Sequence, residues 1–519
     1  MQLESIFVSS RTATVLINDG GLYHTLKPYR LRLNGECFGD TEKTVTSLFG
    51  LWPDTEYRLE LLDGDTFLAG ISFRTVRESC TLNVRRFGAV GDGEHDDTTA
   101  IQSAILCCPK GGRVLIPAGD YRVTPIFLKS HITLEVQKGA TLLLDTDRSR
   151  FPILPGMVQS TDETDDYNYG SWEGNPLDMF AAAITGVDVE DVTLCGEGLI
   201  DGQAQKSDWW QNHRVRRGAW RGRLLFLNRC RNITVQGLSF ANSPSWNLHP
   251  YFSDDLRFLD ISVTAPADSP NTDGFDPESC RNVLLLGAHF SLGDDCIALK
   301  AGKIYMGRRY RRACEHIRIS HCLMENGHGG MTAGSEMAGG VRDVQVSHCL
   351  MRNTDRGLRI KTRRGRGKDG VIDNIVFDNV RMEKVGAPFT VNCLYYCDPD
   401  GHSDWVQSRQ PAPVDDSTPY VGSITFRNVT VDGCGACAGY LLGLPEQPVE
   451  RLTLENVSFT FDPNGKPMAP VMAEGIETCL NRGLEAHFVR ELVLRNVTMQ
   501  GQQGEELVLE QVEKVVREG

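Results

Sequence analysis

A short β-rich unit recurs along most of this chain, and this repetition constrains the fold more than any other feature of the sequence. Each unit opens with a polar or Asn/Arg step and continues into apolar and β-branched residues. Most units begin 23 to 34 residues after the previous one, with longer gaps before the seventh and the ninth. Strand units of this period, with no helix-length amphipathic run between them, predict a right-handed parallel β-helix over residues 83–519. The nine units are RNITVQGLSF, DDLRFLDISV, RNVLLLGAHF, EHIRISHCLM, RDVQVSHCLM, DNIVFDNVRM, GSITFRNVTV, ERLTLENVSF and RELVLRNVTM.

Asparagine stands near the start of six of these coils. Asn tolerates left-handed backbone better than most residues, and its amide can hydrogen-bond along a stack. We therefore expect these residues to have a structural role in the β-helix. They are Asn232, Asn282, Asn374, Asn428, Asn456 and Asn496.

The segment before the repeats has a different pattern. Over residues 1–78, short alternating stretches are separated by Gly, Asn and Asp turns, which predicts a small β-sandwich. The stretch LFGLWPDTEYRLEL resembles the fibronectin type III pattern, in which Leu51, Pro53, Thr55 and Tyr57 precede a central strand. We favour a spacer or docking domain over a carbohydrate-binding module for this segment.

One clear helical stretch interrupts this all-β pattern. DDTTAIQSAILCC, at residues 96–108, opens with acidic and Thr residues and continues with apolar residues at helical spacing. We expect this helix to cap the N-terminal end of the β-helix, where it would cover the edge strands.

Composition limits the partners and the compartment. The net charge of −14 argues against nucleic acid, and no apolar run approaches the roughly 20 residues of a membrane span. The N-terminus lacks an export signal, so we expect a cytoplasmic protein whose 16 cysteines are mostly buried, reduced thiols. The pairs in CGAC (434–437) and CLYYC (393–397) lack the spacing of zinc ligands, so we expect no metal site.

The stretch FSLGDDCIALKAG places two adjacent carboxylates, Asp294 and Asp295, in an apolar segment. Neighbouring strand side chains point to opposite faces, so a pair that acts together must lie at a bend, which Gly293 permits. If one coil takes about 22 residues, Asp273 lies one coil earlier, about 4.8 Å away. Three carboxylates are therefore expected to crowd one patch of the β-helix.

Later coils add a histidine and two cations on the same side. His328 follows in a glycine-flanked turn, and Arg359 and Lys361 are two residues apart, so they share a strand face. Each residue alone has a simpler interpretation as a turn residue or a solvated charge. Their convergence on successive coils favours a functional site.

This combination suits the cleavage of a glycosidic bond. One protonated carboxyl group must protonate the departing oxygen, and one ionised carboxylate must activate water. Crowding pushes carboxyl pKa values apart, so one group can hold its proton while another stays charged. The nearby cations suit a substrate that carries negative charge itself.

Three basic runs are conspicuous in this acidic chain, at residues 214–223, 308–312 and 359–368. Such runs are usually solvated. Because two of them adjoin the expected site, we favour binding of a polyanion.

The sequence is similar to glycoside hydrolase family 28, the polygalacturonases. Four family signatures occur in order, as NTD (271–273), DD (294–295), GHG (327–329) and RIK (359–361). FGAVGDGEHDDTTAIQSAI and IPAGDY resemble the N-terminal cap of pectin-degrading β-helix proteins, and GEGLIDGQ and SPSWNLHP also resemble the family. The resemblance covers residue 83 to near the end of the chain.

The resemblance implies inverting hydrolysis of α-1,4-galacturonosyl bonds, without a metal or an organic cofactor. Asp294 matches the general acid, Asp273 and Asp295 match the carboxylates that hold the attacking water, and His328 matches a histidine that assists the acid. Carboxylates one coil apart are closer than inverting enzymes usually require. Distance alone would favour retention, and we follow the family on stereochemistry.

The same resemblance implies which residues bind the substrate. Arg359 and Lys361 match residues that grip galacturonate carboxylates. Asn271 and His249 lie in two of the family motifs and are expected to contact the substrate as well. The expected partner is oligogalacturonide or polygalacturonate, and the oligomeric state stays open.

The N-terminal domain and three long segments resemble bacterial exo-acting members of the family. The segments, at residues 161–180, 301–314 and 392–420, would block one end of the cleft, which predicts attack at a chain terminus. Alternatives are a rhamnogalacturonan or substituted-galacturonan hydrolase, a pectate lyase, and a non-catalytic glycan-binding β-helix.

Overall fold

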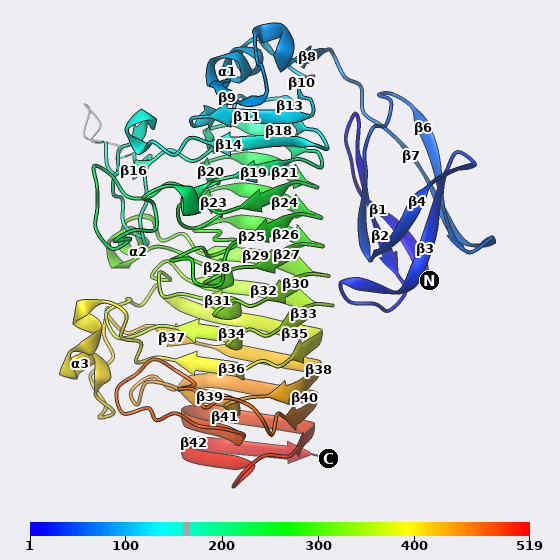
Figure 1. Ribbon diagram of the computed structural model, residues 1–519. Coiled ribbons are helices and arrows are strands. Elements are labelled where there is room, and N and C mark those ends of the chain that lie inside the picture. Colours follow the sequence, from blue (N-terminus) through cyan, green and yellow to red (C-terminus); the bar gives the residue numbers. More distant parts are fainter. Residues whose placement is uncertain (159–166, 519) are drawn as a thin grey trace.

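The computed structural model describes residues 1–158 and 167–518, and most of this chain winds into a right-handed parallel β-helix (Figure 1). Each coil contributes strands to three parallel ladders that run from the blue and cyan end of the chain to the red end. This confirms the predicted fold class. The expected loop at residues 161–180 lies partly outside the described residues, because its first six positions fall there.

The first ladder, ladder A, contains most of the repeated units. It consists of β8 (Thr81–Asn83), β10 (Gly112–Ile116), β13 (Ile132–Val136), β18 (Glu190–Cys195), β21 (Arg231–Gln236), β24 (Asp254–Leu259), β26 (Arg281–Leu286), β29 (Cys314–Ser320), β32 (Val341–Ser347), β35 (Val371–Glu383), β38 (Ser423–Cys434), β40 (Val449–Phe461), β41 (Arg482–Gln500) and β42 (Leu507–Glu518).

Ladder B follows ladder A within each coil and merges with it where the strands lengthen near the C-terminus. It consists of β9 (Asp92–Asp96), β11 (Gly119–Val123), β14 (Ala140–Leu144), β19 (Leu199–Asp201), β22 (Ser239–Ala241), β25 (Ser262–Thr264), β27 (His289–Ser291), β30 (Leu323–Glu325) and β33 (Leu350–Arg352), followed by the second halves of β35, β38 and β40.

Ladder C carries the candidate site. It consists of β12 (Ile126–Phe127), β17 (Ile184–Val187), β20 (Leu225–Asn228), β23 (Leu248–Tyr251), β28 (Asp295–Leu299), β31 (Gly329–Ala333), β34 (Arg356–Lys361), β36 (Ala387–Asn392) and β39 (Cys437–Leu442), followed by the first halves of β41 and β42. Between β23 and β28, isolated bridges through Phe275 and Glu278 continue the ladder.

Apolar side chains from all three ladders fill the interior of the β-helix. Phe240, Phe258 and Phe290 are fully buried there, and the rings of Phe258 and Phe275 lie 4.6 Å apart. Burial of one such side chain stabilises the fold by about 1.5–3 kcal/mol. Because alternate strand residues point outwards, the same strands leave a set of polar positions on the outside.

Helix α1 (Thr98–Cys107) closes the N-terminal end of the β-helix, as predicted (Figure 1). Its residues Ile101, Ala104 and Ile105 are fully buried in the main core. Two further short helices, which the sequence did not predict, occur in long segments that follow ladder C. They are α2 (Ile304–Tyr310) and α3 (Asp404–Gln407).

Small additional elements complete the β-helix. These are β15 (Ile153–Leu154), β16 (Met179–Phe180), β37 (Tyr420–Val421) and the 3-10 turns η1 (Val84–Phe87), η2 (Arg148–Arg150), η3 (Ala204–Lys206) and η4 (Pro399–His402).

The predicted asparagines form a hydrogen-bonded ladder on the outside of the β-helix. All six have φ values near +50°, in the left-handed region. Near the C-terminus, Asn496 Nδ2 donates to Asn456 Oδ1 at 2.9 Å, and Asn456 Nδ2 donates to Asn428 Oδ1 at 3.1 Å. Closer to the N-terminus the acceptors are aspartates, such as Asp191 Oδ1 for Asn232. The ladder therefore has the structural role that the sequence indicated.

The N-terminal segment folds into two antiparallel sheets that share one apolar core. Leu3, Val15, Leu31, Leu59 and Leu61 are among the core residues that the two sheets contribute. One sheet is formed by β1 (Gln2–Val8), β2 (Ala13–Asn18) and β5 (Val45–Leu48), and the other by β4 (Glu36–Lys43), β3 (His24–Leu33), β6 (Glu56–Asp63) and β7 (Thr66–Arg74).

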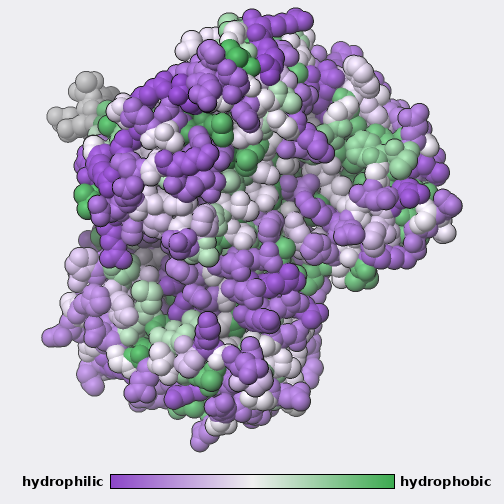
Figure 2. Space-filling model, in the orientation of Figure 1, coloured by the Kyte–Doolittle hydropathy of each residue, from purple (hydrophilic) through white to green (hydrophobic). Residues whose placement is uncertain are grey.

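This sandwich packs against the turns between ladders A and B, on the side away from α2 and α3 (Figure 1). Asp260 accepts hydrogen bonds from Lys43 Nζ at 2.9 Å and from the Ser47 amide at 3.1 Å. Val45 packs against Leu259 and Leu286. The surface seen in Figure 2 is largely hydrophilic over both parts of the molecule. Across the described residues, no helix has the length and apolar character that a membrane crossing requires.

We predict that Asn456→Ala lowers the free energy of unfolding by about 2 kcal/mol. The change removes two ladder hydrogen bonds, and alanine tolerates the left-handed backbone at this position less well than asparagine does. The chemical-denaturation midpoint would measure this. Asn456→Gly is the matched control, since glycine accepts the backbone conformation and loses only the hydrogen bonds. An unchanged midpoint for Asn456→Ala would contradict a stabilising role for the ladder.

Candidate active site

The candidate site lies at the outer face of ladder C. Ile297 and Leu299 of β28 point into the core, and Lys300 follows at the end of the strand. Register pairs Ala298 with Thr332 and Thr332 with Arg359 on the next two strands. Outward side chains from successive coils are therefore stacked into columns, which form the floor of the site.

Three carboxylates meet at the edge of this floor, as the sequence predicted. Asp295 begins β28, Asp294 precedes it, and Asp273 lies on the preceding coil. One carboxylate oxygen from each residue lies within 4.8 Å of the others. Gly293 is required by close packing and not by its φ value, because an added Cβ would lie 2.6 Å from the carbonyl oxygen of Ser269.

Asp295 is clamped by the two predicted cations. Arg359 Nη1 lies 3.0 Å from one of its carboxylate oxygens, and Lys361 Nζ lies 2.8 Å from the other. Burial alone would raise the pKa of Asp295, which is 1% exposed, but Lys361 and Arg359 outweigh it and hold that pKa well below its usual range. Asp295 is therefore an ionised carboxylate across the working pH range of enzymes.

Asp273 has the opposite character. Burial, reinforced by the nearby charge of Asp294, raises the pKa of Asp273 to about 7, and the residue is 4% exposed. Lys300 opposes this shift, with its Nζ atom 3.7 Å from Asp273 Oδ2. Two carboxyl groups in one patch thus differ widely in their affinity for a proton.

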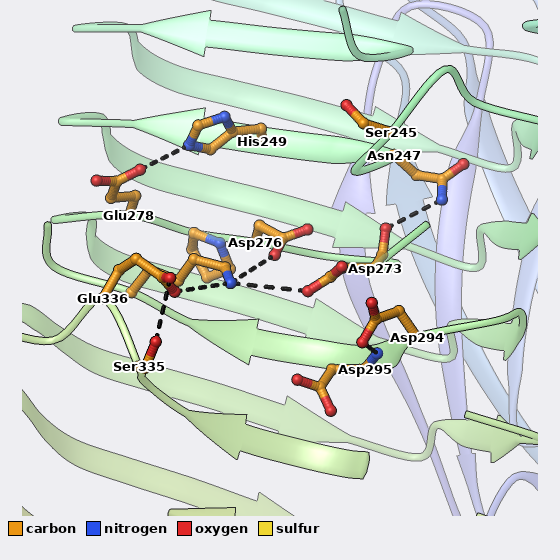
Figure 3. Close-up of polar contacts among 12 residues, drawn as sticks. Ser245, Asn247, His249, Asp273, Asp276, Glu278, Asp294, Asp295, Ser335 and Glu336 are labelled. Carbon is orange, nitrogen blue, oxygen red and sulfur yellow. Dashed lines mark hydrogen bonds and ion pairs between the residues drawn. The ribbon is translucent and has the colours of Figure 1, made fainter. Parts of the chain in front are cut away.

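A deeper pair of carboxyl groups, those of Asp276 and Glu336, lies near Asp273 (Figure 3). The Lys300 Nζ atom lies 3.2 Å from Glu336 Oε2 and 3.5 Å from Asp276 Oδ1, and it is 4.1 Å from the ring centroid of Trp246. Burial, followed by Asp273, raises the pKa of Asp276 well above its ordinary value. Lys300, Asp276 and Glu336 were not among the residues that the sequence predicted for the site. A lone lysine after the apolar run CIAL was the signal available for the first of them.

Asp294 is the most accessible of the three carboxylates. Its side chain is 21% exposed, and its Oδ1 atom accepts the amide hydrogen of Asp295 at 3.0 Å. The His328 Nδ1 atom lies 3.3 Å from the same oxygen, and the His328 side chain is 50% exposed. The hydrogen bond to Asp294 raises the pKa of His328 and outweighs the opposing effect of burial. A solvent-facing carboxyl group with a titratable partner is suited to proton transfer.

The two remaining predicted residues lie beside and beneath the cluster. Asn271, in left-handed backbone with φ +55°, accepts a hydrogen bond from Arg221 Nη2 at 2.6 Å. His249 is fully buried, with Nε2 3.0 Å from Glu278 Oε2 and with Nδ1 facing Arg223 Nε at 3.5 Å. The predicted contact of His249 with substrate is therefore corrected, because its ring is fully enclosed on the covered outer face of β23.

The loop over residues 167–180 explains this burial. Asn168 Nδ2 donates to Tyr251 Oη at 2.6 Å, and the Arg223 guanidinium lies 5.0 Å from the Trp172 ring centroid. The loop thus covers the outer face of β20 and β23, on the coils that precede Asp273. Covering of this kind depends on long-range packing, and no local sequence signal indicates it.

The basic runs are mostly occupied by partners within the protein. Arg216 pairs with Asp178 at 2.7 Å, and the buried Arg364 pairs with Glu446 at 2.6 Å. Arg359 and Lys361 face the carboxylate cluster. Much of the charge in these runs therefore holds loops against the β-helix. The sequence had instead predicted that these runs bind a polyanion.

Three carboxylate oxygens converge in this cluster, as they would in a divalent cation site. Oxygen ligands of this kind suit Mg²⁺ or Ca²⁺. Both oxygens of Asp295 already face cationic side chains, so protein cations balance much of the negative charge. Within the described chain, no cysteine belongs to a group of three candidate metal ligands.

These features define a hydrolase-type site on a β-helix. Carboxyl groups with different pKa values lie beside a histidine and the cationic side chains of Arg359 and Lys361. A family profile described as "Glycosyl hydrolases family 28" matches residues 112–473, and the chain belongs to this family. A second profile, "Rhamnogalacturonase A/epimerase, pectate lyase-like", matches residues 81–135. The protein is therefore a glycoside hydrolase of family 28, as the resemblance implied.

Known relatives carry both endo and exo names. A "Probable polygalacturonase" of Vitis vinifera is 30% identical over 402 residues, covering 76% of this chain and 77% of the relative. An "Endo-polygalacturonase" of Pectobacterium parmentieri is 31% identical over 380 residues, covering 70% of this chain and 84% of the relative. The solved structure of the Yersinia enterocolitica family 28 exopolygalacturonase shares the fold with a TM-score of 0.74 at 18% identity, over 100% of this chain and 98% of that chain.

We predict that Lys361→Met lowers the free energy of unfolding at pH 7 by about 3 kcal/mol, because it removes one partner of a buried charge pair. The depressed pKa of Asp295 adds stability above its unfolded pKa of about 3.9, and that stability is lost as pH falls towards the folded pKa. Without Lys361 the pKa of Asp295 is less depressed, so the stability of the variant falls less as pH is lowered. The difference in unfolding free energy between wild type and variant is therefore smaller at pH 3 than at pH 7. Denaturant titrations at both pH values measure this.

Lys368→Met is the control for this comparison. Lys368 forms an exposed pair with Asp416 at 2.8 Å, and such pairs contribute about 0–1 kcal/mol. A deficit in Lys361→Met that is no larger than that of the control, or that is equal at both pH values, would rule out the clamp on Asp295.

Proposed function

We propose that this enzyme hydrolyses α-1,4-galacturonosyl bonds of polygalacturonate and its oligomers. The observation that carries the proposal is the joint placement of Asp273, Asp294 and Asp295 beside His328 and the Arg359/Lys361 pair. The carboxylate cluster can supply both the acid and the base, and guanidinium and ammonium groups recognise a uronate carboxylate. The polygalacturonase names of the curated relatives support the same substrate.

In the proposed reaction, Asp294 donates a proton to the departing glycosidic oxygen. It is the most exposed carboxylate, and His328 can return a proton to it after each turnover because the two side chains are in contact. Asp295 stays ionised between its two cations, and Asp273 accepts a proton readily because its pKa is raised to about 7. These two groups hold and deprotonate the attacking water.

We further propose direct attack by water, which inverts the anomeric centre. The spacing of the carboxylate oxygens, within 4.8 Å, resembles that of retaining enzymes. A retaining enzyme needs a carboxylate oxygen that is free to attack carbon, however. Each oxygen of Asp295 faces a cation, and Asp273 is buried, so both are better placed to activate water than to form a covalent bond.

We predict that Asp294→Asn lowers kcat by about 10²–10⁴-fold, because the amide cannot donate the proton. Release of reducing ends from polygalacturonate measures the rate, and calorimetric titration with oligogalacturonate is expected to give an unchanged affinity. Asp268→Asn, an exposed carboxylate in the preceding loop, is the control. Full activity of Asp294→Asn would exclude Asp294 as the general acid. A weaker affinity for oligogalacturonate with an unchanged kcat would indicate a role in binding or structure instead.

The exo mode of action is also proposed. The loop over residues 167–180 covers the floor on the coils before Asp273, through contacts to Tyr251 and Arg223. A polymer chain that reached the carboxylates could not continue over β20 and β23. A cleft that is covered at one end favours the release of small products from a chain terminus.

A single lysine ties the three predicted loops together. The amide of Lys303, at the start of α2, donates to the carbonyl oxygen of Gly174 at 2.9 Å. Its Nζ atom lies 3.0 Å from Asp398 Oδ1 and 3.9 Å from Glu173 Oε2. Residues 167–180, 301–314 and 392–420 thus support one another as a continuous wall.

We predict that wild-type enzyme releases mono- or digalacturonate alone from polygalacturonate, whereas Lys303→Met also yields intermediate sizes, because the wall loses its shared ion pairs. Chromatography of a product time course distinguishes the two patterns, and proton NMR of the first product identifies its anomer. Arg311→Met is the control, since it removes an exposed pair with Asp369 in the same segment. A ladder of sizes from wild-type enzyme would refute exo action.

We also propose a cytoplasmic location and a fibronectin type III-like N-terminal domain over residues 1–78, with the β-helix domain over residues 83–519. All 16 cysteines are free thiols, and most are buried, which suits a reducing compartment. The three- and four-stranded sheets of the N-terminal sandwich support the domain assignment. A cytoplasmic enzyme would meet imported oligogalacturonides, which agrees with exo action.

A further inference from the structure

A second groove lies between the N-terminal sandwich and the outer face of ladder A. It has a volume of about 340 Å³ and is separate from the carboxylate cluster, with which it shares no lining residue. Residues 7–10 and 76–77 of the sandwich form one wall, and residues 110–111 and 131–133 lie on the β-helix side. The groove therefore exists only because the sandwich is held beside the β-helix.

The floor of this groove repeats from coil to coil. Thr133 pairs in register with Thr193, Thr193 with Thr234, and Thr234 with Arg257. Their strand neighbours, such as Leu134, are buried in the core, so these four side chains point outwards. Over the part of the chain that the structure describes, none of the three threonine hydroxyls has a hydrogen-bond partner in the protein.

The lining of the groove carries net positive charge, although the chain as a whole has a net charge of −14. Among the described residues, neither Lys110 nor Arg257 has a carboxylate within ion-pair distance, and Arg257 instead donates to Asn232 Oδ1 at 2.9 Å. Arg77 adds a cation at the rim, paired with Asp54 at 3.0 Å. The one carboxylate in the described lining, Asp191, already accepts a hydrogen bond from Asn232 Nδ2 at 2.7 Å, and its Oδ2 atom is 3.0 Å from His131 Nδ1.

We propose that this groove is a second binding site for de-esterified oligogalacturonate, an inference that rests on the function proposed above. Neighbouring coils are about 4.8 Å apart, which is comparable to the length of one sugar ring in an extended chain. The threonine hydroxyls on successive coils can hydrogen-bond to sugar hydroxyls. Lys110 and Arg257 can form ion pairs with uronate carboxylates. A chain held in the groove raises the local concentration of termini for the carboxylate site.

The test measures binding in the Asp294→Asn background, so that the probe is not consumed. Fluorescence anisotropy with a labelled long oligogalacturonate is compared with trigalacturonate and with polyglutamate. Arg257→Glu and the double variant Thr193→Val/Thr234→Val are expected to weaken binding of the long oligomer about tenfold and to leave trigalacturonate binding unchanged. Polyglutamate is expected to bind at least about tenfold more weakly than the long oligomer.

Arg318→Glu is the matched control. Arg318 lies in the same outward column of ladder A, two coils beyond Arg257, and does not line the groove. In otherwise wild-type enzyme, Arg257→Glu is expected to raise KM for polygalacturonate about tenfold with kcat unchanged, and to leave kcat/KM for trigalacturonate unchanged. Arg257→Gln, a milder change, is expected to show the same pattern if Arg257→Glu folds poorly.

Equal binding by the Arg257 and Arg318 variants would overturn the inference, as would equal binding of polyglutamate and oligogalacturonate. If the wild-type enzyme hydrolyses no galacturonide, the proposed function fails whatever the binding assay gives. If hydrolysis of trigalacturonate is normal and the Arg257 variants match the control on the polymer, the groove inference alone fails.

Discussion

The structure depends on the in-register parallel pairing of successive coils. Each backbone hydrogen bond between coils fixes not only a strand but the position of every outward side chain above and below it. Residues far apart in the sequence, such as Asp295 and Arg359, are thereby brought into contact without any local interaction between them. The asparagine ladder and the carboxylate cluster are two consequences of the same register, one structural and one chemical.

This stacking gathers several buried carboxyl groups in the site, and their negative charge has to be balanced. The floor collects the carboxyl groups of Asp273, Asp276 and Asp295, and burial penalises each of them if it ionises alone. Arg359 and Lys361 balance Asp295, whereas Lys300 is shared between several acids. Asp295 is therefore held as an anion, whereas burial raises the pKa values of Asp273 and Asp276. The same imbalance that would destabilise an ordinary core leaves neighbouring carboxyl groups with different affinities for a proton, which acid–base chemistry requires.

Sequence reasoning could predict those features that depend on the period of the coil. The β-helix follows from the spacing of the units, and the meeting of Asp273, Asp294 and Asp295 follows from counting one coil length backwards. The left-handed asparagines follow from residue chemistry alone. Features that depend on loops crossing between coils could not be predicted from the sequence, because the packing of loops does not repeat with the coil length. The enclosure of His249 and the partners of the basic runs belong to this second group.

The loops and the N-terminal sandwich modify one regular solenoid on two opposite sides. On the side of ladder C, residues 167–180 fill the outer face of β20 and β23, and the fully buried His249 and Tyr251 show how completely the floor is covered there. On the side of ladder A, the sandwich stands away from the outer face and leaves a polar groove. A β-helix alone presents long, open faces, which suit binding along a polymer. Here the loops cover one face of the scaffold, and the sandwich walls a separate groove on another face.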